Sequence, residues 1–194
     1  MATIPIKTAT ATHANQAMAV VVLAFSTDPV VRWGYPDPHQ YLMYFPDIVR
    51  AFAGQAFEQQ TAYYVDDFAG AALWLPPGIA PDEEAVASLL QRSVAEPLQE
   101  EVFGVLEQMG SYHPSEPHWY LPFIGVETRY QRRGLGAALM AHALIPCDRD
   151  RKLAYLESTN PENIPLYERC GFELLGTIQV GSSPPVFPML RKPR

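Results

Sequence analysis

Nineteen prolines interrupt the 194 residues of this chain, about twice the usual proportion, and they restrict where regular structure can form. Proline has no backbone N–H, and its ring clashes with the preceding turn of a helix. Long intervals without proline are therefore the segments expected to form helices and strands. Within a strand pattern, proline indicates an edge strand or a bulge.

In the first half of the chain, two helical patterns precede the first clear pair of strands. Apolar residues every three or four positions indicate helices, whereas short alternating or apolar runs indicate strands. The predicted elements are a strand at 4–8, a helix at 12–25 with Thr12 as its N-cap, and a helix that starts at Asp37-Pro38 and breaks or kinks at Pro46. A hairpin of strands 61–65 and 69–75 follows, and then a helical region at 81–110 that is disturbed at Pro97.

In the second half, a strand, a helix and another strand across 119–157 predict a parallel crossover. Pro122 lies inside the first of these strands, where we expect a bulge. The predicted elements are a strand at 119–126, a helix at 134–145 ended by Pro146 and a strand at 153–156. They end with a helix at 164–170 capped by Gly171, a strand at 172–180, and a strand at 186–190 that Pro188 restricts to an edge.

Composition and charge exclude several classes of protein. With 48% hydrophobic residues the chain can form a core, and its length fits a single globular domain over 1–194. The net charge of −7 disfavours nucleic-acid binding, and the longest apolar run, nine residues at 17–25, is far shorter than the roughly 20 that span a membrane. Two cysteines are too few for a disulfide framework, and His118 and His142 lack metal-ligand spacing. We therefore expect a cytoplasmic protein with no metal site and structural histidines.

A glycine-containing loop, 131–137, joins the bulged strand to the following helix. Glycines and the free N–H groups of a first helical turn favour an anion, and Arg129, Arg132 and Arg133 make this part of an acidic chain positive. The glycines could instead ease helix packing, and the arginines could be solvated surface charges. A nucleotide P-loop would need a Lys-Ser/Thr pair that is missing here. A dinucleotide fingerprint, with Glu157 as its acid, fits less well because Leu139 replaces the third glycine.

Two sequence blocks resemble the GNAT superfamily of N-acetyltransferases. The segment Gln131-x-x-Gly134-x-Gly136 is similar to the family's acetyl-CoA pyrophosphate loop, and 160–172, from Asn160 to Gly171-Phe172, is similar to its downstream block. The segments 119–126 and 156–160 resemble the branch that contains puromycin N-acetyltransferase. The resemblance implies a mixed α/β fold with three α/β/α layers. Its central seven-stranded, mostly antiparallel sheet is splayed between strands 4 and 5, and 81–110 would be a helical insertion.

The resemblance also implies which residues form the site. The pantetheine arm of acetyl-CoA would bind the backbone of the fourth strand, and its pyrophosphate would bind the loop amides. The cofactor-binding residues implied are Ile124, Gly125, Val126, Gln131, Arg132, Arg133, Gly134, Leu135, Gly136, Ala137, Asn160 and Asn163. The two asparagines could instead cap the short helix.

For catalysis, the resemblance implies Tyr167 as the acid that protonates the leaving thiolate, although a tyrosine there could also be a packing residue. Glu157 is our choice for the base, with Glu127 as second choice, and Glu157 could equally be a structural acceptor. Trp33, Tyr35 and Tyr120 are expected to line the acceptor site, although the loop at 28–37 could be an ordinary turn over the core.

The implied function is an acetyl-CoA-dependent N-acetyltransferase that acts on a primary amine of a small molecule by direct attack in a ternary complex. Two alternatives belong to other classes: a non-catalytic acyl-CoA sensor, and a dinucleotide-binding oxidoreductase. The acceptor amine, the length of the acyl group and the oligomeric state, including a homodimer, are left open by the sequence.

Overall fold

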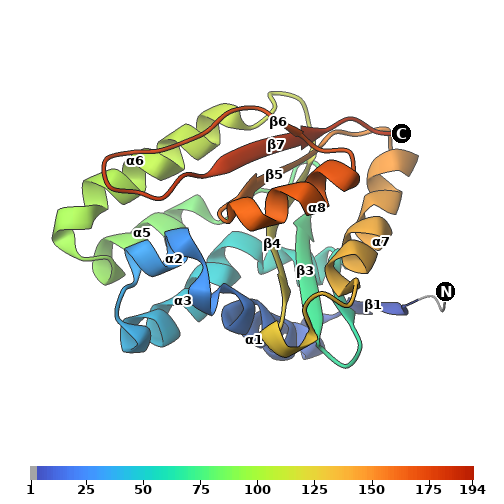
Figure 1. The fold of residues 1–194 in the computed structure, drawn as a ribbon, viewed down its shortest axis with the longest axis horizontal. Coiled ribbons are helices and arrows are strands. Elements are labelled where there is room, and N and C mark those ends of the chain that lie inside the picture. Colours follow the sequence, from blue (N-terminus) through green and yellow to red (C-terminus); the bar gives the residue numbers. More distant parts are fainter. Residues whose placement is uncertain (1–3) are drawn as a thin grey trace.

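The computed structural model describes residues 4–194, which form a seven-stranded sheet with helices on both faces (Figure 1). The strands are β1 (Ile6–Ala9), β2 (Ala62–Val65), β3 (Gly70–Leu75), β4 (Trp119–Val126), β5 (Ala154–Ser158), β6 (Glu173–Leu174) and β7 (Phe187–Arg191). The α-helices are α1 (Ala14–Ala24), α2 (Pro29–Gly34), α3 (Pro38–Ala53), α4 (Gln55–Glu58), α5 (Glu83–Ser93), α6 (Glu96–Tyr112), α7 (Leu135–Arg149) and α8 (Ile164–Arg169).

Two apolar clusters give the fold its three layers, as predicted. One cluster joins α1, α3 and α5 to one face of the sheet, and the other joins α7 and α8 to the opposite face. The strand order is β1-β2-β3-β4-β5-β7-β6, and every pairing is antiparallel except that of β4 with β5. This mostly antiparallel sheet is not the parallel doubly wound sheet on which dinucleotide sites are built, so the fold disfavours the oxidoreductase alternative.

The predicted bulge and splay are both present in β4. Leu73 pairs with Phe123 and Leu75 with Tyr120, so two residues of β4 oppose the single Trp74 of β3. This two-against-one register is a β-bulge, and it includes Pro122. Pairing of β4 with β5 ends at 121 and 156, and the last five residues of β4 diverge from β5.

Two prolines that we expect to interrupt or end helices lie inside them. Helix α3 continues through Pro46, and α7 continues through Pro146 to Arg149 rather than ending there. A proline in a helix interior costs about 3 kcal/mol. Leu42, whose carbonyl loses its partner at Pro46, is 60% exposed and open to water. Cys147, which follows Pro146, is fully buried, so packing holds the last turn of α7 in place.

Helix boundaries near the N-terminus differ from the prediction. The expected helix at 12–25 begins with a 3-10 turn, Ala11–His13, and its N-cap is Thr10 rather than Thr12. The backbone N–H of Thr10 donates to Nδ1 of His13 at 3.1 Å, an interaction that the helical pattern did not reveal. The region at 81–110 forms α5 and α6, and Pro97 lies in the first turn of α6, where its missing N–H has no helical partner to lose.

The last strands also differ from the prediction. The strand expected at 172–180 is reduced to β6 and an isolated bridge at Ile178, and β7 lies between β5 and β6 rather than at the edge. Pro188 is tolerated in an interior strand because of its orientation. The carbonyl of Pro188 accepts a hydrogen bond from the N–H of Leu175, on the β6 side and just beyond the last β6 pair at 174. Because the nitrogen and carbonyl of one strand residue point to the same side, the nitrogen of Pro188 also faces away from β5. The missing N–H therefore removes no hydrogen bond to β5.

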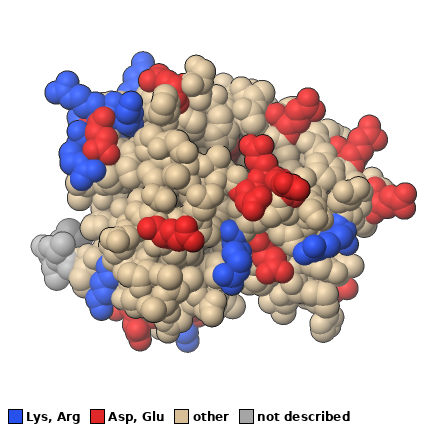
Figure 2. All heavy atoms as spheres, turned by 180° about the vertical axis from the view of Figure 1, so that it is seen from behind, with Lys and Arg blue, Asp and Glu red and all other residues tan. Residues whose placement is uncertain are grey.

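Charged groups are distributed unevenly over the surface. The view from behind shows basic side chains at the corner where α7 and the C-terminus meet, and acidic side chains toward the side of α5 and α6 (Figure 2). Among residues 4–194, no helix is both long enough and apolar enough to cross a lipid bilayer.

A buried arginine joins β7 to α7. Arg191 is 3% exposed, and its guanidinium donates two hydrogen bonds to the carboxylate of Asp148, at 2.7 and 2.9 Å, and one to the carbonyl of Cys170. The hydrogen bonds from Arg191 lower the pKa of Asp148. The pair therefore fixes the C-terminal strand against the end of α7.

Replacing Asp148 with alanine should reduce the free energy of unfolding by about 3 kcal/mol, because the buried Arg191 charge loses its partner. Because the pKa of Asp148 is lower in the folded than in the unfolded protein, this carboxylate stabilises the fold at any pH above its unfolded pKa of 3.8. The contribution is lost as the pH falls through the lower pKa of the folded state. Urea unfolding at pH 7 and pH 3 measures both effects. Asp150→Ala, which removes an exposed pair with Arg149, is the control expected to change little, and equal loss in both variants would contradict the assignment.

Candidate active site

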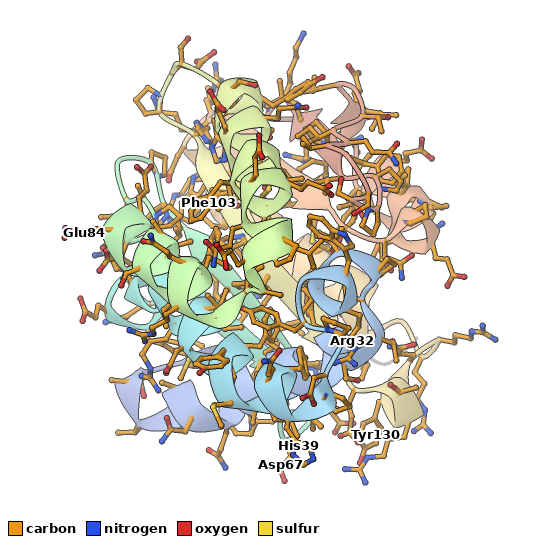
Figure 3. All side chains as sticks on the ribbon, turned by 90° about the vertical axis from the view of Figure 1, so that its left-hand side faces the viewer. Arg32, His39, Asp67, Glu84, Phe103 and Tyr130 are labelled. Atoms are coloured by element: carbon orange, nitrogen blue, oxygen red, sulfur yellow. The ribbon has the colours of Figure 1, made fainter. Side chains whose placement is uncertain are left out.

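A single cleft of about 640 Å³ runs through the opening between β4 and β5. Its walls come from the first turn of α7 and from α8 on one side, and from α2, α3, α5 and α6 on the other. Figure 3 labels Arg32 on α2 and Tyr130 on the turn before α7, which lie on the same side of the molecule, and Tyr130 lines the cleft. The residues predicted for the site line the cleft, except Arg133 and the second-choice base Glu127.

The loop before α7 forms a cradle of backbone N–H groups. Arg132 and Gly134 have φ values of +61° and +80°, and this left-handed backbone turns the chain sharply into the helix. The six amides from 132 to 137 have no backbone acceptor within residues 4–194. Free N–H groups at a helix N-terminus bind anions, so the cradle fits the pyrophosphate of a CoA ester.

The opened edge of β4 supplies further backbone groups. The N–H of Glu127 donates to the carbonyl of Ala69, just before β3. By alternation the backbone groups of Ile124 and Val126 therefore point the other way, into the opening. One of these groups is already used, because Nε2 of Gln131 donates to the carbonyl of Val126 at 3.1 Å. Gly125 is required for packing, since a Cβ there would lie 2.6 Å from the Cβ of Ala24.

The positive charges near the cradle are only partly available. Nε of Arg129 lies 2.5 Å from Oε1 of Glu127, and the guanidinium groups of Arg129 and Arg133 lie over the ring of Tyr130. Arg132 is exposed and lines the cleft. Glu127, our second choice for the base, does not line the cleft, whereas Glu157 does.

Tyr167 lies on α8, on the same side of the cleft as the first turn of α7, and is 5% exposed. Burial raises the pKa of its phenol, and the negative charge of Asp28 raises it further, so the hydroxyl keeps its proton near neutral pH. The helix that carries it, α8, ends in a Schellman motif at Gly171, as predicted: the N–H of Phe172 donates to the carbonyl of Tyr167, and that of Gly171 to Glu168. Burial also raises the pKa of the Cys170 thiol, which fits a packing role.

The two asparagines of the downstream block differ in how their side chains are used. Oδ1 of Asn160 accepts from the N–H of Glu162 at 3.0 Å and so caps the short 3-10 helix Pro161–Asn163. This is the capping role that we consider as the alternative. Asn163 is exposed at the cleft and makes no side-chain hydrogen bond to any of residues 4–194.

Asp28 connects the two walls of the cleft. Its carboxylate accepts from the N–H groups of Val30 and Val31, both at 3.0 Å, and so caps α2, a helix that the sequence pattern did not reveal. Its other oxygen accepts from the hydroxyl of Thr159, after β5, at 2.5 Å. Burial raises the pKa of Asp28, and these three hydrogen bonds oppose that effect.

Glu157 points away from α7, toward the end of α6. Its side chain is 2% exposed, and its Oε1 lies 3.2 Å from Nε2 of His113, which is the C-cap of α6. Nδ1 of His113 lies 3.1 Å from Nε2 of His118, whose Nδ1 lies 2.9 Å from the carbonyl oxygen of Glu116. His118, which we predict to be structural, therefore belongs to a chain of polar contacts that reaches the candidate base.

Two of the three aromatic residues predicted for the acceptor site, Trp33 and Tyr35, are held by hydrogen bonds. Nε1 of Trp33 donates to Oγ of Ser182 at 3.1 Å, and Ser182 donates to Glu101 of α6, so the indole is fixed between α2 and the 175–186 loop. The hydroxyl of Tyr35 is 2.6 Å from Oγ of Ser93, inside the core. Tyr35 can therefore offer its ring to a ligand, but its hydroxyl is occupied.

Comparisons with known proteins agree with this geometry. The model of the acetyltransferase (GNAT) family matches residues 42–172, two thirds of the chain. The chain belongs to the acetyltransferase (GNAT) family. An uncharacterised N-acetyltransferase of Schizosaccharomyces pombe is 25% identical over 177 residues, which are 81% of this chain and 70% of that protein. Acetyl transfer to an amine is therefore the activity class of the chain, and the puromycin acetyltransferase branch stays a prediction.

Two solved structures share the fold of this GNAT enzyme. An acetyltransferase from Corynebacterium glutamicum, described as related to histone acetyltransferase, has a TM-score of 0.71 and 23% identity, covering 100% of this chain and 98% of its own. The polyamine N-acetyltransferase of Drosophila melanogaster has a TM-score of 0.68 and 13% identity, covering 97% and 99%. At these identities the likeness supports the fold and not the substrate.

Sequence reasoning did not assign a site role to several residues of this acetyltransferase. Asp28 precedes a proline, a helix-start signal that could have placed it as a cap. His113 has no motif around it, because its contact with Glu157 depends on how α6 ends above the sheet. The apolar wall of the acceptor end comes from α3, α5, α6 and the C-cap of α5, namely Phe45, Ile48, Phe52, Leu90, Val94, Val102, Val105, Leu106 and Met109.

Replacing Thr159 with valine, which has nearly the same shape, should destabilise this GNAT fold by about 1–3 kcal/mol, because a buried oxygen of Asp28 loses its hydrogen bond. Chemical denaturation measures the change in unfolding free energy. Thr128→Val is the matched control, since Thr128 is exposed and makes no side-chain hydrogen bond within residues 4–194. A Thr159 variant as stable as the wild type would show that this contact does not join the two walls.

Proposed function

We propose that this enzyme transfers the acetyl group of acetyl-CoA to a primary amine of a small molecule, by direct attack while both substrates are bound. The observation that carries the proposal is the single continuous cleft through the β4–β5 opening. One end has a cradle for an anion, and the other end is apolar. A ligand at each end would bring its reactive group to the middle, between Tyr167 and Glu157, where proximity alone accelerates transfer.

Acetyl-CoA supplies a thioester when it is bound. We assign its pyrophosphate to the amides at 132–137, because these N–H groups lack acceptors and lie at the positive end of the α7 dipole. We assign its pantetheine arm to the free backbone groups of Ile124 and the N–H of Val126, which extend the sheet at its opened edge. Asn163 is a further candidate for the pantetheine amides.

Tyr167 and Glu157 are assigned opposite proton transfers. A primary amine is largely protonated at neutral pH and must lose a proton before it attacks, and Glu157 is the carboxylate that would take that proton. Tyr167 would give its phenolic proton to the departing sulfur, a role for which a phenol that stays protonated is suited. No covalent enzyme intermediate is needed, because the amine attacks the acyl carbon directly.

The chemistry of the acceptor end favours an amine with an apolar body. Among the cleft residues from α1, α2, α3, α5, α6 and the segments between them, Asp28 is the one acidic residue, and its carboxylate already accepts three hydrogen bonds. A polyamine, the substrate class named for the Drosophila structure, would need more free carboxylates along its length. The aromatic and aliphatic lining matches an arylalkylamine or a similar amine instead.

Tyr167→Phe and Glu157→Gln should each lower kcat by about 10²-fold or more, the contribution typical of a positioned acid or base, with little change in acetyl-CoA affinity. Thiol release over a panel of arylalkylamines and polyamines measures turnover. Tyr63→Phe, at a buried phenol outside the cleft, is the control expected to keep full activity. Acetyl-CoA binding without turnover on any amine would contradict the enzyme proposal and favour an acyl-CoA sensor.

Gly134→Val should weaken CoA binding by at least tenfold, because a branched residue is strained at φ +80° and would distort the cradle. Gly78→Val is the matched control, since Gly78 has φ +88° and lies outside the cleft. Both variants carry similar backbone strain, so they should lose similar stability. Isothermal titration with CoA separates them, and normal affinity in the Gly134 variant would remove the loop assignment.

A further inference from the structure

A histidine outside the two blocks that resemble the GNAT family contacts the candidate base. His113 caps the C-terminal end of α6, from which the chain passes over the upper end of β4 and β5 in Figure 1. Its Nε2 lies 3.2 Å from Oε1 of Glu157. The His113 side chain is 29% exposed, whereas that of Glu157 is 2% exposed. The ring therefore lies between a buried carboxylate and solvent.

The hydrogen-bond partners of His113 and His118 determine which nitrogen of each ring carries the hydrogen. Nδ1 of His118 lies 2.9 Å from the carbonyl oxygen of Glu116, which can only accept, so this nitrogen carries a hydrogen. Burial lowers the pKa of His118, which keeps the ring neutral and leaves its Nε2 as an acceptor. Nδ1 of His113, 3.1 Å away, must then be the donor. A neutral His113 consequently presents the lone pair of Nε2 to Glu157.

Two acceptors therefore face each other where Nε2 of His113 meets Oε1 of Glu157. Oε1 is a buried atom without a hydrogen bond among residues 4–194, which is an unfavourable state for a carboxylate oxygen. One proton placed between the two atoms would satisfy both. The contact is therefore favourable when the pair holds one proton more than it does with His113 neutral and Glu157 ionised.

We propose that His113 is the proton partner of Glu157: it accepts the proton that Glu157 removes from the acceptor ammonium group and releases it to solvent. This inference rests on the proposed function. The proton leaves the ammonium nitrogen for the Glu157 carboxylate, then moves from Oε1 to Nε2 of His113, which becomes an imidazolium. Loss of the Nε2 proton to water restores the neutral ring and the carboxylate.

The surroundings of His113 favour this charge change. The C-terminal end of the α6 dipole stabilises a cation at the cap position. The rings packed on His113 are those of Tyr120 on β4, 4.7 Å away, Tyr155 on β5, 4.4 Å away, and His118. Burial, followed by the negative charge of Glu157 and a hydrogen bond with its carboxylate, raises the pKa of both tyrosines. These neighbours remain neutral, so Glu157 supplies the charge that attracts the imidazolium.

His113→Ala should lower kcat by about 10- to 100-fold, somewhat less than loss of the base itself, with acceptor KM and acetyl-CoA affinity nearly unchanged. The acid side of the pH–rate profile should change in this variant, because the imidazole that takes the proton from Glu157 is removed. Added imidazole should restore much of the lost rate, which it would not do for a merely structural side chain. His142→Ala, a partly buried histidine outside the cleft that packs on Tyr63, is the control expected to keep full activity and no response to imidazole.

A second pair of variants tests the direction of the hydrogen bonds. His113→Gln can donate to Glu157 but cannot carry a proton, so it should fold as well as the wild type and remain as slow as His113→Ala. His118→Phe removes the acceptor that fixes the His113 tautomer and should give a smaller loss of kcat. Thermal unfolding and circular dichroism verify that each variant is folded.

The possible results separate this inference from the proposed function. An inactive wild type on every amine would overturn the proposed function itself. An active wild type, an inactive Glu157→Gln variant and a His113→Ala variant with unchanged kcat and pH profile would overturn the relay alone. A loss of activity in folded His113→Ala that imidazole does not restore would also overturn it.

Discussion

The site depends on one interruption of the sheet, the point at which β4 stops pairing with β5. A proline in the bulge cannot continue the ladder with an N–H, and two residues of β4 occupy the space opposite Trp74. After this bulge, alternate backbone groups of β4 face an opening instead of a neighbouring strand. The cleft exists because these groups are left free, and the helices on both faces keep the two strands from closing again.

The two ends of the cleft have different origins in the sequence. The donor end is local: the loop at 131–137 contains two left-handed residues, Arg132 and Gly134, and leads directly into α7. The acceptor end is assembled from α2, α3, α5 and α6, which are far apart in the chain and meet only through packing. Such a division lets one family keep a donor site while the acceptor wall differs between members.

The same contrast explains how much could be predicted. The bulge at Pro122 and the cap at Gly171 follow from local backbone chemistry, and the structure has both. Pro146 does not end its helix and Pro188 does not lie in an edge strand, contrary to what local rules predict. Tertiary packing holds the last turn of α7 despite Pro146, and the orientation of β7 means that the missing N–H of Pro188 breaks no hydrogen bond to β5. The contact between His113 and Glu157 joins residues far apart in the sequence, and no spacing or motif announces it.

Two buried carboxylates at the cleft show how hydrogen-bond saturation separates structure from chemistry. Asp28 accepts three hydrogen bonds, so both of its oxygens are occupied and its role is to hold α2 against the loop after β5. The side chain of Glu157 is 2% exposed, and Tyr120 and Tyr155 contact its carboxylate, yet the atom Oε1 has no hydrogen bond among the residues described, and an imidazole nitrogen faces it. Folding alone gains nothing from an unsatisfied buried acceptor. Its presence is explained if the enzyme must pass through a state in which that oxygen carries a proton.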